Sequence, residues 1–194
     1  MTEIKEMGRK YFVRPIVGLL MALKIHPNVI TVASLVLAII AFFFYKNGVF
    51  WAGAIFLFWC GVFDSFDGDI ARRRNMITKL GGFLDSTIDR VNEFIIYFGL
   101  FFYYYDEGGG AILFWTMVAA FGSMMVSYTR ARAEGLGISP QVGIFERFTR
   151  IVLLIAGSVF GPEFMQYIIV ILALGTILTT VQRILYVRKY SREH

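Results

Sequence analysis

Six predominantly apolar runs divide this sequence, and their lengths restrict the folds that it can adopt. Of the 194 residues, 57% are hydrophobic and 17% are aromatic. A soluble domain of this length would not contain so many long apolar segments, whereas roughly 20 such residues suffice for a helix to cross a bilayer. We therefore expect a single-domain, all-α integral membrane protein over residues 1–194. The six transmembrane helices are expected at residues 29–45, 50–71, 81–104, 111–131, 146–161 and 164–186.

The first 24 residues differ from the apolar runs because basic side chains are interleaved with apolar ones. This pattern is typical of an amphipathic helix that lies in the membrane interface, with a kink at Pro15. The alternative is an ordinary basic flank of the first span. We expect an interfacial helix over residues 1–24, a six-helix bundle over residues 25–187 and a cytoplasmic tail over residues 188–194.

Lysine and arginine residues are distributed unevenly between the two ends of the predicted helices. They gather near the amino end, over residues 72–79 and 130–150, and near the carboxyl end. On the opposite side, only Lys46 falls in a loop. Because loops rich in basic residues stay in the cytoplasm, we expect both termini and residues 64–89 on the cytoplasmic side of the cell membrane.

Two stripes of carboxylates lie on consecutive predicted helices. Asp64, Asp67 and Gly68 share one helix face by their spacing, and Asp85 and Asp89 share a face of the next helix. Completing spans of roughly 20 residues places these carboxylates at membrane depth, where charged groups are costly. Two like charges about 6 Å apart repel by roughly 3 kcal/mol even at an effective dielectric constant near 20. The four aspartates therefore need protons or cations.

Divalent metal ions are the cations that this composition favours. Carboxylate oxygens suit Mg²⁺ or Mn²⁺, and a chain with 1 Cys and 2 His offers almost nothing to zinc. Gly68 leaves room for a ligand beside its helix, and Arg72, one turn further on, can meet a phosphate. Together these residues predict a site for a metal and a diphosphate.

The aspartate spacing resembles the signature of a known family. D-x2-D-G-x2-A-R-x8-G-x3-D-x3-D is complete from Asp64 to Asp89 and resembles the motif of the CDP-alcohol phosphatidyltransferases. The resemblance implies transfer of a CDP-linked phosphoryl group to an alcohol, with release of CMP, by a homodimer. It also implies that Asp64, Asp67, Asp85 and Asp89 bind two ions of Mg²⁺ or Mn²⁺, and that Asp89 is the general base.

A short segment before the first span interrupts the apolar pattern. Asn28 and Thr31 can simply cap the helix that follows. The segment also resembles the P-N-x-I-T element that lies beside the nucleotide in this family. The residues expected to contact the CDP-lipid are Asn28, Thr31, Asp67, Gly68, Arg72 and Thr78.

A second cluster of basic residues surrounds the start of the fifth predicted span. Arginines at cytoplasmic helix ends often only extend toward the interface, which is the simpler interpretation. Arg150, however, lies inside the expected span and needs a partner anion. Glu134 and Glu146 can each form a salt bridge, but two carboxylates cannot neutralise the whole cluster, and the surplus predicts a bound phosphate. The residues expected at this phosphate site are Ser127, Arg130, Arg132, Arg147, Arg150 and Arg183.

The sequence around this cluster also carries a resemblance. S-Y-x-R-A-R-A-E-x-L-G followed by G-x-x-E-R-x-x-R is similar to the acceptor region of phosphatidylinositol-phosphate and archaetidylinositol-phosphate synthases. The resemblance implies inositol 1-phosphate as the acceptor, with a donor lipid of either the diacylglycerol or the archaeol type. Glycerol 3-phosphate or another polyol phosphate also offers the required anion and remains an alternative.

Two other functional classes place aspartates inside a membrane. A divalent-cation channel or carrier would leave Gly68, Arg72 and the basic cluster without a role, and basic groups would repel the permeant ion. An intramembrane aspartyl protease needs only two aspartates that share a proton. An enzyme is therefore favoured, with membrane lipids as its surroundings and no nucleic acid as a partner.

Overall fold

The computed structural model describes residues 27–73 and 78–193, and within those ranges the regular structure is entirely α-helical. The expected all-α fold is thereby confirmed for this part of the chain. The predicted interfacial helix over residues 1–24 lies outside the described residues. The six helices are α3 (Pro27–Lys46), α4 (Phe50–Arg73), α5 (Lys79–Asp106), α6 (Ala111–Glu134), α7 (Arg147–Phe160) and α8 (Pro162–Glu193).

Each predicted span coincides with one helix to within a few residues, except that α8 continues to Glu193 through most of the expected tail. Within residues 27–73 and 78–193, three helical segments are long and apolar enough to cross a membrane by themselves, namely Val29–Lys46, Ala111–Glu134 and Pro162–Arg192. In α4 the apolar part is the shorter segment Phe50–Asp64. The chain thus has the character of a membrane protein, while six crossings remain a prediction.

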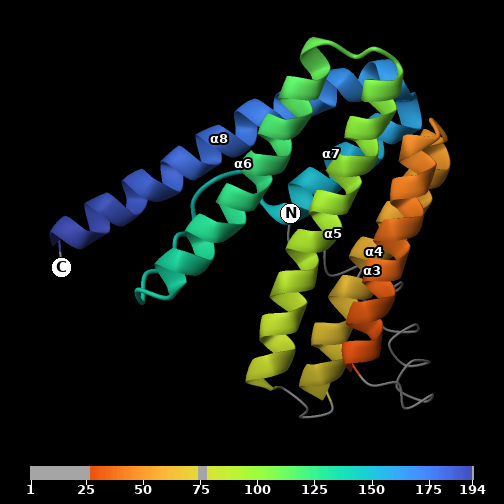
Figure 1. Ribbon diagram of the computed structural model, residues 1–194. Helices are drawn as coiled ribbons and strands as arrows, with labels where there is room; N and C mark the ends of the chain where they lie inside the picture. Colours follow the sequence, from red (N-terminus) through yellow and green to blue (C-terminus); the bar gives the residue numbers. More distant parts are fainter. Residues whose placement is uncertain (1–26, 74–77, 194) are drawn as a thin grey trace.

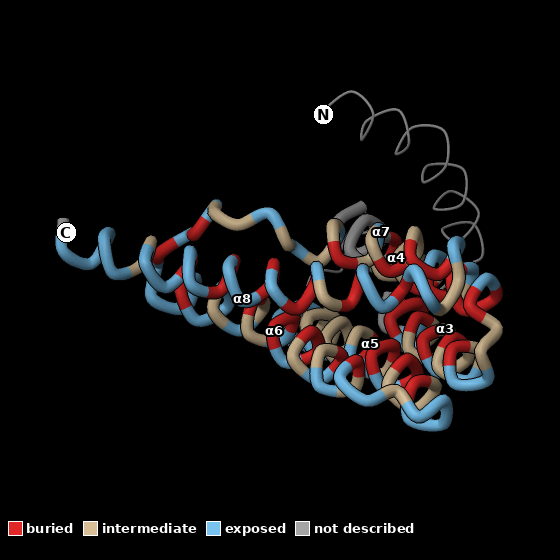
Figure 2. The backbone as a smooth tube through the Cα atoms, turned by 90° about the horizontal axis from the view of Figure 1, so that it is seen from above, coloured by how far each residue is buried: buried red, intermediate tan, exposed pale blue. Residues whose placement is uncertain are grey.

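The helices form two groups that diverge from each other. In Figure 1, α3, α4 and α5 lie side by side, and α3 packs against both of the others. The pair α6 and α8 diverges from this group, and the carboxyl-terminal part of α8 extends away from it in Figures 1 and 2. Helix α7 packs against α4 and α8, while α6 contacts α5. The two groups are therefore joined by the contacts of α7 and by the contact between α5 and α6.

The apolar core lies where the two groups join. Leu57 of α4, Leu100 of α5, Leu154 of α7 and Leu172 of α8 are all buried in one cluster. Many large apolar side chains are exposed on the helices, for example Phe43, Phe114 and Leu178. Figure 2 shows exposed positions along every helix that it labels. Such surfaces are costly in water and suit contact with lipid.

Two local features hold the helices in place. At Gly99 the α5 backbone approaches α3 so closely that an added Cβ would lie 2.9 Å from the carbonyl oxygen of Phe42. Between α7 and α8, Gly161 has a φ of 90°, a backbone conformation that favours glycine. This turn allows α8 to begin directly at Pro162. The hydroxyl of Tyr104 donates to the Pro162 carbonyl at 2.6 Å, which ties the end of α5 to the start of α8.

Candidate active site

Three aspartates converge where α4 faces α5. Asp85 and Asp89 stand one turn apart on α5, and Asp64 lies on α4 opposite them. One carboxylate oxygen from each lies within 4.8 Å of the other two. The structure thus brings together three of the four aspartates that were predicted to bind metal. We call them the acidic cluster.

Asp67 is the fourth aspartate of the predicted set. It lies one turn after Asp64 in the α4 helix, and Gly68 and Arg72 follow it on the same helix. The side chains of Asp67 and Arg72 lie outside the described residues, as does that of Asn28. The roles predicted for these residues therefore stay predictions.

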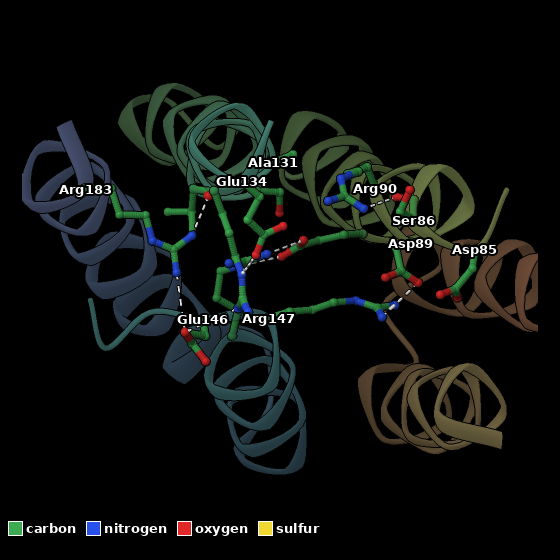
Figure 3. Close-up of a pocket in the computed structure, with 14 residues that line it drawn as sticks. Asp85, Ser86, Asp89, Arg90, Ala131, Glu134, Glu146, Arg147 and Arg183 are labelled. Atoms are coloured by element: carbon green, nitrogen blue, oxygen red, sulfur yellow. Dashed lines mark hydrogen bonds and ion pairs between the residues drawn. The ribbon is translucent and has the colours of Figure 1, made fainter. Parts of the chain in front are cut away.

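Arg147, the first residue of α7, forms ion pairs within the acidic cluster. Its guanidinium contacts the Asp64 carboxylate, and its Nη1 atom lies 2.8 Å from Asp89 Oδ1. Figure 3 shows this side chain reaching across the site toward Asp89. One cation thus pairs with two of the three clustered carboxylates, whose charges would otherwise repel one another more strongly.

The acidic cluster has the chemistry of a divalent-metal site. Its donors are hard carboxylate oxygens at short mutual distances, as Mg²⁺ and Mn²⁺ require. Asp89 Oδ1 is buried and lies 2.8 Å from Arg147 Nη1, so a cation already faces this oxygen and a metal ion would meet the same negative charge. The residues present therefore fit such an ion.

A cavity of about 450 Å³ adjoins the acidic cluster. Figure 3 shows Asp85 and Asp89 at one end of it, and Glu146 and Arg183 toward the other. One wall of the cavity is formed by α6. Val126, Arg130 and Glu134 recur every fourth residue and therefore share the face of α6 that lines the cavity. The cavity is lined by Asp85, Ser86, Asp89, Arg90, Glu93, Val126, Ser127, Arg130, Ala131, Glu134, Glu146, Arg147, Arg150 and Arg183.

Comparison with known proteins identifies the kind of enzyme that this site belongs to. The family model of the CDP-alcohol phosphatidyltransferases matches residues 24–182. The chain belongs to this family. It is therefore a CDP-alcohol phosphatidyltransferase, an enzyme of phospholipid biosynthesis, and its resemblance to the family is confirmed.

Individual relatives match this transferase over most of its length. The archaetidylinositol phosphate synthase of Methanothermobacter thermautotrophicus is 41% identical over 162 residues, which cover 81% of this chain and 80% of the relative. The crystal structure of Mycobacterium tuberculosis phosphatidylinositol phosphate synthase with CDP-DAG bound has a TM-score of 0.83 and 28% identity, and the match covers 91% and 93% of the two chains. The same synthase in complex with manganese and citrate gives a TM-score of 0.80 at 27% identity, over 89% and 87% of the chains.

Five of the six residues predicted for the acceptor phosphate line the cavity of the transferase: Ser127, Arg130, Arg147, Arg150 and Arg183. Arg132 does not. It lines a separate hollow with Tyr128 and Leu136 on another side of α6. The physical reason is that residues two apart on a helix point about 200° apart, so Arg130 and Arg132 cannot face one cavity. The structure gives no support to a phosphate contact by Arg132.

The carboxylate partners of the arginines differ from those expected. We expected Glu134 or Glu146 beside Arg150, but its partner is Glu93, at 2.6 Å from Arg150 Nε and 2.7 Å from Nη2. Glu134 instead pairs with Arg130 at 3.0 Å. Glu146 pairs with Arg130 at 3.6 Å and with Arg183 at 3.4 Å.

The prediction that arginines outnumber carboxylates was wrong for the lining of this cavity. Five arginines and five carboxylates line the cavity, so that their formal charges cancel. Sequence reasoning missed Glu93 because it lies in an apolar run, 57 positions before its partner. One signal was present, since Glu93 follows Asp89 by four residues and continues the stripe of Asp85 and Asp89.

Thr31 and Thr78, which were predicted to contact the CDP-lipid, both take part in hydrogen bonds that hold helices in place. Thr78 Oγ1 accepts a hydrogen bond from the Gly81 backbone amide at 2.9 Å, so it caps α5. Thr31 is buried within α3, which begins at Pro27, and therefore it is not the helix cap. Its carbonyl accepts from Ser34 Oγ at 2.7 Å, and Asn92 of α5 donates to that same hydroxyl at 3.0 Å. This chain of contacts holds the start of α3 against the helix that carries Asp85 and Asp89.

Proposed function

We propose that this transferase moves a phosphatidyl-type group from a CDP-lipid to inositol 1-phosphate and releases CMP. The observation that carries the proposal is the arginine-lined cavity that opens beside the acidic cluster and shares Asp85 and Asp89 with it. A phosphorylated acceptor in the cavity would then lie next to a donor diphosphate at the aspartates. The names of the relatives above agree with this acceptor.

The donor side of the site consists of the aspartates and the start of α3. Two ions of Mg²⁺ or Mn²⁺ on Asp64, Asp67, Asp85 and Asp89 would neutralise the diphosphate and the departing CMP. Arg72 would add a charge-assisted contact to the same phosphates. The remaining donor contacts in this proposal are Asn28, Thr31, Gly68 and Thr78. The donor lipid carries diacylglycerol or archaeol.

Asp89 is the proposed general base. It belongs to both the acidic cluster and the cavity wall, and its buried Oδ1 atom lies beside the Arg147 guanidinium. An acceptor hydroxyl beside it would transfer its proton to this carboxylate as the oxygen attacks the phosphorus that bears the lipid. The new oxygen–phosphorus bond forms as the bond to CMP breaks.

The acceptor phosphate would bind among the cavity arginines once the acidic end is neutralised. With cations on Asp85 and Asp89, the carboxylates left to face the five arginines of the wall are Glu93, Glu134 and Glu146. The wall then carries net positive charge, which suits a phosphate dianion. Ser127, Arg130, Arg147, Arg150 and Arg183 are the proposed contacts.

Glycerol 3-phosphate or another polyol phosphate is the second candidate acceptor, because the same arginines would bind its phosphate. A divalent-cation channel is not supported, since the chain belongs to a family of transferases. The proposed location is the cell membrane, crossed six times by a homodimer, with both termini and the site on the cytoplasmic side, where the basic loops favour them.

An acceptor panel tests the function. The purified protein receives one CDP-lipid and Mn²⁺, and CMP release is measured with inositol 1-phosphate, free inositol, glycerol 3-phosphate or serine. We expect inositol 1-phosphate to give the highest kcat/KM. A higher kcat/KM for glycerol 3-phosphate would make that compound the acceptor in place of inositol 1-phosphate. An equal kcat/KM for free inositol would contradict a phosphate site. Repeating the panel with diacylglycerol and archaeol donors identifies the lipid.

A further inference from the structure

Glu93 extends the carboxylate stripe of α5 into the cavity. It follows Asp89 by one helical turn, lines the cavity and has 9% of its side chain exposed. The corresponding exposed fractions are 18% for Asp89 and 49% for Glu146. Among these carboxylates Glu93 is thus the one most shielded from solvent, and a charge in that position needs a close partner.

Arg150 of α7 is that partner, and the two groups meet in a fork. Arg150 Nε donates to Oε1 of Glu93 at 2.6 Å, and Nη2 donates to Oε2 at 2.7 Å. The third contact runs from Nη1 to the Phe145 carbonyl at 2.9 Å. A guanidinium has five N–H groups, so these contacts leave one on each terminal nitrogen. The Arg150 side chain lines the cavity but is 0% exposed in this structure, so a phosphate that enters the cavity would have to displace neighbouring side chains to meet these two groups bidentately.

The ion pair is not explained by helix packing alone. Helix α5 packs mainly against α3 and α6, and α7 packs against α4 and α8. Glu93 and Arg150 therefore join two helices that share little direct contact, and both residues line the cavity. A buried ion pair generally adds little stability compared with apolar residues of the same size. A role in binding within the cavity therefore explains this ion pair better than a contribution to stability does.

We propose that Glu93 is a positioning residue for the acceptor, and that it acts by holding the Arg150 guanidinium in the orientation that binds the acceptor's phosphate. Glu93 itself does not touch the acceptor. The inference rests on the proposed function in one respect, namely that the acceptor carries a phosphate. It adds a residue outside the aspartate signature to the determinants of acceptor affinity.

The first test is steady-state kinetics of Glu93→Gln with inositol 1-phosphate and CDP-lipid varied separately. Glutamine keeps the size of the side chain but replaces one acceptor oxygen by a donor, so the fork cannot form. We expect the acceptor KM to rise by roughly tenfold, with kcat and the CDP-lipid KM nearly unchanged. Glu93→Asp keeps the charge but moves it by one methylene, and we expect a smaller rise in the same constant.

A double-mutant cycle tests whether Glu93 acts through Arg150. Arg150→Gln alone should raise the acceptor KM, and Glu93→Gln added to it should raise that constant little further. The double variant also removes both buried charges, which protects the comparison if Glu93→Gln by itself does not fold. Glu107→Gln is the matched control, because Glu107 is exposed at the other end of α5 and should leave all constants as they are.

Distinct results would overturn the inference. If the folded Glu93→Gln or Glu93→Asp variant keeps the acceptor KM and loses only thermal stability, Glu93 has a structural role. If the effects of Glu93→Gln and Arg150→Gln multiply, Glu93 does not act through Arg150. Failure of the wild type to prefer inositol 1-phosphate to free inositol contradicts the proposed function before any variant is compared. A preference in the wild type with an unchanged KM in the variants contradicts only the role of Glu93.

Discussion

Asp89 and Arg147 connect the two halves of the site at the scale of single residues. Asp89 belongs to the acidic cluster and to the cavity wall, and Arg147 pairs with it and with Asp64. The proposed base, the proposed metal ligands and one of the proposed phosphate contacts are thus immediate neighbours. Substitutions here should separate chemistry from binding, because each residue contributes a different group.

Asp89→Asn should reduce turnover by roughly 10²–10⁴-fold, since asparagine cannot accept the acceptor's proton. Mn²⁺ affinity should fall much less, because Asp64 and Asp85 keep their oxygens in the cluster. CMP release at saturating Mn²⁺ and calorimetric Mn²⁺ titration measure the two effects. Asp106→Asn, at the exposed end of the same helix, is the control. Near-normal turnover in Asp89→Asn would refute the role of Asp89 as the general base.

Asp64→Asn should act on the metal. The variant loses one charged oxygen of the cluster, so the Mn²⁺ concentration that gives half-maximal activity should rise by roughly tenfold or more. A Mn²⁺ titration of CMP release, repeated with Mg²⁺, measures the shift. An unchanged Mn²⁺ dependence, with the fold intact, would count against Asp64 as a ligand.

At the scale of secondary structure, the site depends on how closely α3 and α5 approach. Gly99 allows this approach, and the Ser34–Asn92 hydrogen bond joins the same two helices nearer to the aspartates. The helix that carries Asp85 and Asp89 is thereby fixed relative to the start of α3. A wider separation would alter the stability of the helix group and the geometry of the donor site together.

Gly99→Ala should lower the free energy of unfolding by about 1–3 kcal/mol, because its Cβ would lie 2.9 Å from a backbone oxygen that cannot move away cheaply. Gly82→Ala is the matched control on the same helix, since an added Cβ there meets nothing within 4 Å. The control should be neutral or more stable by up to about 1 kcal/mol. Thermal unfolding in detergent compares the two. Equal melting temperatures would show that α3 and α5 tolerate separation.

At the scale of the whole molecule, charge and apolarity indicate how the chain sits in the membrane. The loop between α5 and α6 contains no basic residue, whereas Arg130 and Arg147 flank the loop between α6 and α7. Only α6, one of the three candidate spans, separates these two loops. The positive-inside rule then assigns them to opposite sides of the membrane.

Single-cysteine labelling tests this orientation. Cys60 is the one cysteine of the chain and is buried, so Cys60→Ala provides a background for Glu107→Cys or Ser139→Cys at exposed positions. In intact cells, a membrane-impermeant maleimide should label the first variant and should reach the second only after lysis. Labelling of both variants from one side would refute the predicted crossing by α6.

Local patterns in the sequence determined the helices and part of the site. Except at the carboxyl end of α8, apolar runs predicted helix bounds to within a few residues, because each helix contains a continuous apolar segment. The i, i+4 spacing of Asp85 and Asp89 put both on one helix face, since 3.6 residues make one turn. The aspartate signature likewise identified the enzyme family from residues close together in the chain.

Only the tertiary structure decided which helix faces meet. It paired Arg150 with Glu93, placed Arg147 against Asp64 and Asp89, and turned Arg132 away from the cavity. These outcomes depend on residues far apart in the chain and on the angle at which α7 enters between the two helix groups. Periodicity states which residues share a face, but it does not state what that face contacts, because partner choice is set by the packing of the whole bundle.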